Sequence, residues 1–118
     1  MWLMIAGPYS HPDPAERARR LEQLNLAAVG AKERGYTPII GVNAALPVLA
    51  AAGLPDSHPW MMELSMALAE RCDACLLLAP SPGASREAQS FRARGLPVYH
   101  TLDELPARTG PPAGLRPK

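Results

Sequence analysis

The stretch ACLLLA, residues 74–79, decides the fold class, because it is apolar on both faces of an extended chain. A strand of this kind needs cover on both sides, which is typical of parallel sheets packed between helices. Three more short runs, at residues 2–6, 37–41 and 97–100, are predicted to be the other strands of the sheet. We therefore expect a parallel sheet of four to five strands, the fifth being an edge element.

Helical patterns separate the predicted strands. Asp13 is placed to cap a helix whose first turn holds Pro14, and Gly35 follows its last apolar residues and ends it. Further helices are predicted at residues 43–53, 60–71 and 85–94. Strands that alternate with helices predict an α/β fold, in which helices cover both faces of the sheet.

The predicted strand order is 2-1-3-4, which places the carboxyl ends of the first and third strands side by side. The strand order reverses at that point, and open α/β sheets usually bind their ligands there. We therefore expect the loops that follow residues 2–6 and 74–79 to share one cleft.

The chain of 118 residues is most simply one domain, which we expect to span residues 1–105. Thr101 and Glu104 have the spacing of a capping box, which predicts a last helical turn. Residues 106–118 contain four prolines and two glycines with little apolar content, and we expect this tail to be disordered.

The composition argues against several classes of function. Twelve Lys and Arg residues against eleven Asp and Glu give a net charge of +1, which does not indicate a nucleic-acid partner. No run is long enough to span a membrane or to form a secretion signal, so we expect a cytoplasmic protein without a membrane partner. Cys72 and Cys75 end a helix and enter a strand, which favours structural thiols over redox chemistry. The three histidines are scattered, and neither a metal site nor a cofactor is expected.

The loop after the first strand reads Gly7-Pro8-Tyr9-Ser10. Gly7 allows a ligand to approach the backbone, Tyr9 offers a ring that stacks or hydrogen-bonds, and Ser10 offers a hydroxyl. The alternative is a tight strand exit in which Tyr9 covers the end of the core. Both interpretations stay open.

The loop after the third strand leads from Ser81 to Glu87. Gly83 and Ala84 turn the chain, and the free N–H groups of the following helix start suit a phosphate or another anion. Glu87 is then expected in the first turn of that helix. The alternative is a solvated, inert carboxylate that only complements the helix dipole. The loop matches neither the Walker A motif nor G-x-G-x-x-G.

Other residues allow two interpretations each. Asn43 follows the second strand, where it either lines the cleft or caps a helix. Trp60, Met61 and Met62 wall a base-binding pocket, form a subunit contact or belong to the core. Arg86 contacts a ligand phosphate or lies on the surface. The remaining arginines are expected on the solvated face of a helix, and they are Arg17, Arg19 and Arg20.

Three motifs together resemble the nucleoside 2-deoxyribosyltransferase-like superfamily. They are AGPYS at residues 6–10, CD at 72–73 before a leucine-rich strand, and S-x-G-x-x-x-E at 81–87. The opening PYSHPDP at residues 8–14, followed by an arginine-bearing helix, is similar to small bacterial branches of that superfamily. The resemblance covers residues 2 to 100, and it depends on the order and spacing of the motifs rather than on any one of them.

The resemblance implies a flavodoxin-like three-layer sandwich that forms a homodimer or a higher homo-oligomer. It also implies cleavage or exchange of the N-glycosidic bond of a nucleoside or its 5′-monophosphate, without a cofactor. Glu87 matches the nucleophile, which forms a glycosyl-enzyme that water or another base releases. Ser81 matches a contact to the sugar or phosphate, Gly83 a glycine that lets the ligand approach, and Tyr9 the loop around the base or sugar.

One departure from the family pattern concerns its general acid. Active members carry an aspartate about two helical turns before the residue that matches Asp73, and this chain has Ser65 there. A serine hydroxyl is not a general acid near neutral pH. Glu63 is the closest carboxylate, but two residues along a helix rotate the side chain by roughly 200°. Asp73 itself, at a helix-to-strand junction, is expected to be mainly structural.

Three hypotheses therefore remain at the level of sequence. The first is an enzyme that acts on an N-glycosidic bond through Glu87, with residues 7–10, Asn43, Ser65, Ser81 and Gly83 around the substrate. The second is a nucleotide-binding or sensing module that has kept the cleft without turnover. The third is a structural or interaction protein, since fold does not fix function.

Overall fold

The computed structural model describes residues 1–107. The strands are β1 (Trp2–Ala6), β2 (Thr37–Ile39), β3 (Ala74–Leu77) and β4 (Val98–Tyr99). The helices are α1 (Pro14–Glu33), α2 (Gly41–Ala51), α3 (His58–Ala69) and α4 (Pro82–Ala93), followed by the short 3-10 helix η1 (Leu102–Glu104). All four strands run parallel in the order β2-β1-β3-β4, so the predicted fold class and strand order are confirmed.

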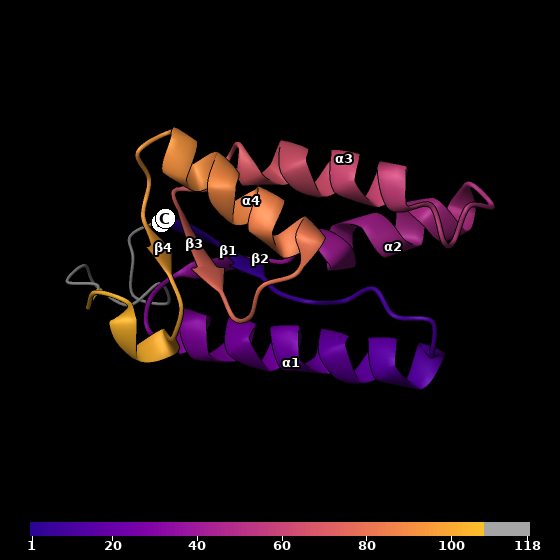
Figure 1. The fold of residues 1–118 in the computed structure, drawn as a ribbon. Helices are drawn as coiled ribbons and strands as arrows, with labels where there is room; N and C mark the ends of the chain where they lie inside the picture. Colours follow the sequence, from indigo (N-terminus) through magenta and orange to yellow (C-terminus); the bar gives the residue numbers. More distant parts are fainter. Residues whose placement is uncertain (108–118) are drawn as a thin grey trace, which may run out of the picture.

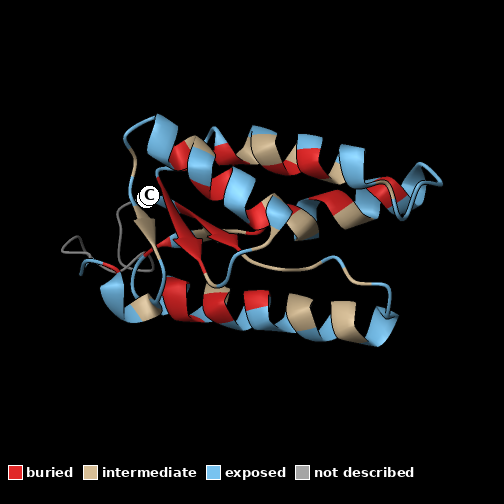
Figure 2. Ribbon diagram, in the orientation of Figure 1, coloured by how far each residue is buried: buried red, intermediate tan, exposed pale blue. Residues whose placement is uncertain are grey.

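The helices pack on both faces of the sheet, as in a flavodoxin-like three-layer sandwich. Figure 1 shows α1 on one face and α2, α3 and α4 on the other. Strand β1 supplies both cores, because successive side chains of a strand point to opposite faces. Leu3 and Ile5 pack with α1, whereas Met4 and Ala6 pack with α3 and α4. The buried positions lie mainly in the central strands β1 and β3 and on the inner helix faces, whereas β2 and β4 have no buried residue (Figure 2).

Helix α1 begins and ends as the sequence predicts. The Oδ1 atom of Asp13 accepts a hydrogen bond of 3.0 Å from the backbone N–H of Ala15, and Pro14 is the first helical residue. Gly35 has a φ of 92°, a left-handed conformation that glycine adopts without a steric penalty. Local signals thus set both ends of this helix.

The predicted starts of two other helices are wrong. Helix α2 begins at Gly41, directly after a strand that ends at Ile39, and Asn43 lies inside the helix rather than at its cap. Helix α4 begins at Pro82 with Ser81 as its cap. The segment predicted to be a loop is therefore already helical, and Glu87 lies in the second turn instead of the first.

The start of β3 is tied to the start of β1 by Asp73. Its Oδ2 atom accepts a hydrogen bond of 2.8 Å from the backbone N–H of Trp2, and its own N–H donates to the carbonyl of Trp2 at 2.8 Å. These bonds agree with the structural role expected for Asp73. Burial raises the pKa of Cys72 to about 11 and that of Cys75 to about 12, so both are protonated thiols at neutral pH.

The end of the described chain forms η1. Thr101 makes no capping hydrogen bond, and the backbone N–H of His100 donates to the carboxylate of Glu104 at 3.2 and 3.3 Å. The predicted last turn is present, but not through the expected capping box. Most of the tail predicted to be disordered, residues 108–118, lies outside the described residues.

Two kinds of feature are absent from residues 1–107. No helix in this part of the chain is both long enough and apolar enough to cross a bilayer. The same residues contain no group of three or more His, Cys, Asp or Glu side chains that could hold a metal ion.

Candidate functional site

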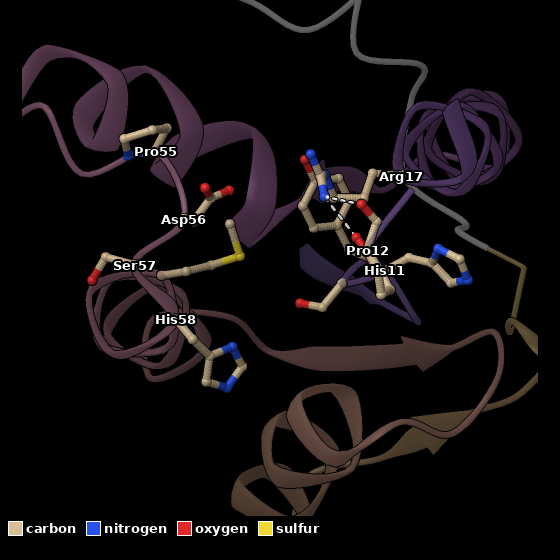
Figure 3. A pocket seen from close by; sticks show the side chains of 10 residues that line it. His11, Pro12, Arg17, Pro55, Asp56, Ser57 and His58 are labelled. Carbon is tan, nitrogen blue, oxygen red and sulfur yellow. Dashed lines mark hydrogen bonds between the residues drawn. The ribbon is translucent and has the colours of Figure 1, made fainter. Parts of the chain in front are cut away.

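A pocket of about 490 Å³ opens between two segments that are far apart in the sequence. One wall is the loop after β1 and the first turn of α1, and it comprises Tyr9, Ser10, His11, Pro12 and Arg17. The other wall is the turn before α3 and the first turns of α3, and it comprises Pro55, Asp56, Ser57, His58 and Met61. Figure 3 shows the two walls facing each other, with Arg17 on one side and Asp56 on the other. Two predicted site residues, Tyr9 and Ser10, therefore line a real cavity.

Arginines of α1 fix the first wall in place. The Nη1 atom of Arg17 donates to the carbonyl of His11 at 2.6 Å and to that of Pro12 at 3.4 Å. The Nη1 atom of Arg20 donates to the carbonyl of Ser10 at 2.8 Å. The helix face expected to be merely solvated therefore contributes Arg17 to the pocket and Arg20 to the support of the loop.

The second wall is held by the cap of α3. The Oγ atom of Ser57 accepts a hydrogen bond of 3.4 Å from the backbone N–H of Trp60. Of the three apolar residues considered for a pocket wall, Met61 lines the pocket and Met62 is buried, whereas Trp60 is 42% exposed. The sequence pattern does not predict the polar part of this wall, Asp56 and His58. A Ser cap followed by Pro59 at the second helical position is the local signal that marks the helix start there.

Ser65 and Glu87 form a buried polar pair between α3 and α4. They are 4% and 8% exposed, and they are the only buried polar or charged side chains in the described part of the chain. The Oγ atom of Ser65 donates a hydrogen bond to Oε2 of Glu87. The idea of a solvated Glu87 at a helix start is therefore wrong. Burial raises the pKa of Glu87, and the hydrogen bond from Ser65 opposes part of that shift.

Gly41 makes room for this pair. A Cβ atom at Gly41 would overlap the Oγ atom of Ser65 and would lie 2.7 Å from its Cβ. Gly41 is the first residue of α2, at the carboxyl end of β2. The sequence gives little sign of this role, because it depends on how α2 packs against α3.

The other predicted site residues make structural contacts. Gly83 lies against α3, since a Cβ there would be 3.1 Å from the sulfur of Met62. Gly7 lies against α1, where a Cβ would be 3.0 Å from a methyl group of Leu24. Neither they nor Pro8 line the pocket described above.

Ser81 and Asn43 also have partners within the protein. The Oγ atom of Ser81 accepts a hydrogen bond of 3.1 Å from the backbone N–H of Ala84, which caps α4. The Nδ2 atom of Asn43 donates to Oδ1 of Asn25 at 2.6 Å and so links α2 to α1. The structure thus gives each of them a role in holding elements together.

Helix α3 connects the pocket to the buried pair. Met61 lines the pocket and Ser65 follows it by four residues, which places both on one helix face with Cβ atoms about 5–6 Å apart. The pair therefore lies about one helical turn beyond the pocket along α3. Strands β1 and β3 are neighbours in the sheet, and Ala6 pairs with Leu77 at their carboxyl ends. The loop after β1 lines the pocket, but no residue of the loop after β3 does, so the expectation that these two loops share one cleft is not met by this pocket.

Comparisons with known proteins add no further assignment. The sequence matches no family model, and it matches no curated protein.

Proposed function

We propose that the protein cleaves or transfers the N-glycosidic bond of a nucleoside or nucleotide, with Glu87 as the nucleophile. The main support is the buried hydrogen bond between Ser65 and Glu87, one helical turn along α3 from a pocket of about 490 Å³. A pocket of this size is within the range of small-molecule sites. The resemblance of the motifs at residues 6–10, 72–73 and 81–87 supports the same chemistry.

The proposed reaction has two balanced steps. In the first, a carboxylate oxygen of Glu87 forms a bond to the anomeric carbon while the bond from that carbon to the base nitrogen breaks. The base leaves with the bonding electrons and takes a proton from water. In the second step, water or another base attacks the anomeric carbon, releases Glu87 as a carboxylate and loses a proton to solvent. Both steps pass through an oxocarbenium-like transition state.

Ser65 supports this role by favouring the reactive form of Glu87. A nucleophilic carboxylate has to be ionised, and burial disfavours ionisation. A hydroxyl that donates to the carboxylate stabilises the ionised form. The described residues leave no fully buried side-chain oxygen or nitrogen without a partner, so the second oxygen of Glu87 retains contact with the surface.

A second candidate function is nucleotide binding without turnover. The observation that favours it is Ser65 itself, because its hydroxyl is not an acid that protonates a leaving base near neutral pH. Within residues 1–107, no carboxyl group of another residue hydrogen-bonds to Glu87. On this alternative, the pocket and the pair bind a nucleotide and the protein acts as a sensor.

Two assays on the same ligand panel separate these functions. Deoxynucleosides and their 5′-monophosphates are incubated with the protein, and chromatography measures the released base. Thermal unfolding in the same ligands measures binding, since a ligand at 100 times its Kd stabilises by about 2.7 kcal/mol. Base release supports the enzyme. Stabilisation without release supports the sensor, and no response to any ligand contradicts both.

A further inference from the structure

We infer that Arg17 determines specificity by binding a phosphate group of the ligand, so that the pocket prefers a nucleoside monophosphate to the nucleoside. The identity of the nucleoside part of the ligand rests on the proposed function. The phosphate contact itself follows from the charges and donors of the pocket.

The guanidinium of Arg17 is oriented by the protein but only partly used. Its Nη1 atom donates to the carbonyls of His11 and Pro12, which hold the group at the pocket wall. None of the described residues accepts a hydrogen bond from its Nε or Nη2 atoms. A guanidinium carries five N–H donors in a rigid fork that fits phosphate oxygens. A guanidinium that the protein already holds in place loses less conformational entropy when it binds a ligand.

Arg17 also lacks a counter-ion within residues 1–107. The nearest acidic residue on its own helix, Glu16, is paired with Arg19 and Arg20. The carboxylate of Asp13 accepts the N–H of Ala15 as the helix cap. Both acidic neighbours on the first turn are therefore engaged elsewhere. A cation at a pocket wall without an ion pair favours an anionic ligand.

The rest of the pocket limits where that anion is placed. Asp56 lies on the opposite wall, and no described residue donates to its carboxylate. It repels a phosphate, which keeps the phosphate near Arg17, and it accepts hydrogen bonds from sugar hydroxyls. Helices α1 and α3 both begin at the walls, so their positive dipole ends add to the attraction for an anion.

Another arginine provides a matched control. Arg86 is exposed on α4 and does not line the pocket. The sequence left open a phosphate contact for Arg86, which is next to Glu87 in the sequence. Replacing either arginine by glutamine removes the same charge from the protein.

The test compares the Kd values of a deoxynucleoside and its 5′-monophosphate, measured by titration calorimetry. The wild-type protein is expected to bind the monophosphate at least about tenfold more tightly, as charge-assisted hydrogen bonds predict. Arg17→Gln should remove this preference, so that the Kd values of the two ligands agree within about twofold, even if loss of the bonds to His11 and Pro12 weakens both. Arg17→Lys, which keeps the charge without the fork of donors, should retain part of the preference. Arg86→Gln should behave as wild type, and inorganic phosphate should compete with the monophosphate only when Arg17 is present.

Several results would overturn the inference. They are equal binding of the two ligands by the wild-type protein, an equal loss of both in Arg17→Gln, and a loss of preference in Arg86→Gln. Failure of the monophosphate to bind overturns it as well. Base release without a phosphate preference would overturn the inference and leave the proposed function intact. A phosphate preference that depends on Arg17, without base release, would support the inference and contradict the glycosidic chemistry.

Discussion

At the scale of single residues, the chemistry of the site depends on the protonation of Glu87. Its carboxylate is almost fully buried, and one hydroxyl, that of Ser65, hydrogen-bonds to it. Burial makes the neutral acid more stable in the folded protein than in the unfolded chain. Ionising this buried carboxyl, as the proposed reaction requires, therefore costs the folded protein stability.

This balance predicts how stability changes with pH. Because the folded pKa of Glu87 is raised, its contribution to stability is present below the unfolded pKa and is lost as pH rises through the folded pKa. Glu87→Gln keeps the acceptor for Ser65 without the charge. Its free energy of unfolding should exceed that of the wild type above the folded pKa, and the difference should shrink as the pH falls below it. Urea unfolding across pH measures the difference. A difference that does not change with pH would contradict the raised pKa.

Gly41 gives a second prediction at this scale. Gly41→Ala should cost about 1–3 kcal/mol of stability, because its Cβ overlaps the side chain of Ser65. Gly83→Ala is the control, since its Cβ meets only the flexible end of Met62 at 3.1 Å. It should cost less in chemical unfolding experiments. Adding Ser65→Gly to Gly41→Ala should recover part of the lost free energy of unfolding. If the losses of the two substitutions simply added, the overlap would not be the cause.

At the scale of elements, the start of α4 decides where Glu87 lies. The helix begins at Pro82 under the cap of Ser81, so Glu87 is carried into the interior against α3. Small residues give no apolar periodicity there, which is why the sequence pattern predicted a loop. Ser followed by Pro is a known helix-start signal, and it was the stronger indication. The start of α2 at Gly41 is harder to predict, because no side chain caps it.

The cap of α4 can be tested directly. Ser81→Ala removes the hydrogen bond to the N–H of Ala84 and should destabilise the protein by about 1 kcal/mol. Ser81→Asp preserves a capping acceptor and should remain close to wild type. Denaturant unfolding of the three proteins compares them. If both substitutions were equally costly, a role other than capping would have to explain Ser81.

At the scale of the whole molecule, the sheet could be predicted and the pocket could not. Strand order 2-1-3-4 follows from alternating strands and helices and from short connections. Of the two loops expected to form the cleft, only the one after β1 lines the pocket. The pocket needs residues 9–17 to face residues 55–61. No hydrogen bond or ion pair joins these walls within residues 1–107, so neither segment carries a local signal for the other. Arg17 and Asp56 were missed for that reason.

Base release from a deoxynucleoside or its 5′-monophosphate tests the central claim most directly, with wild type, Glu87→Gln and Glu63→Gln compared side by side. Glu63 is an exposed residue of α3, so its substitution removes one carboxylate without touching the pair. Loss of a nucleophile should reduce the rate at least about a thousandfold in Glu87→Gln, while Glu63→Gln keeps the wild-type rate. An unchanged rate of release in Glu87→Gln, or no release by the wild-type protein, would contradict the account.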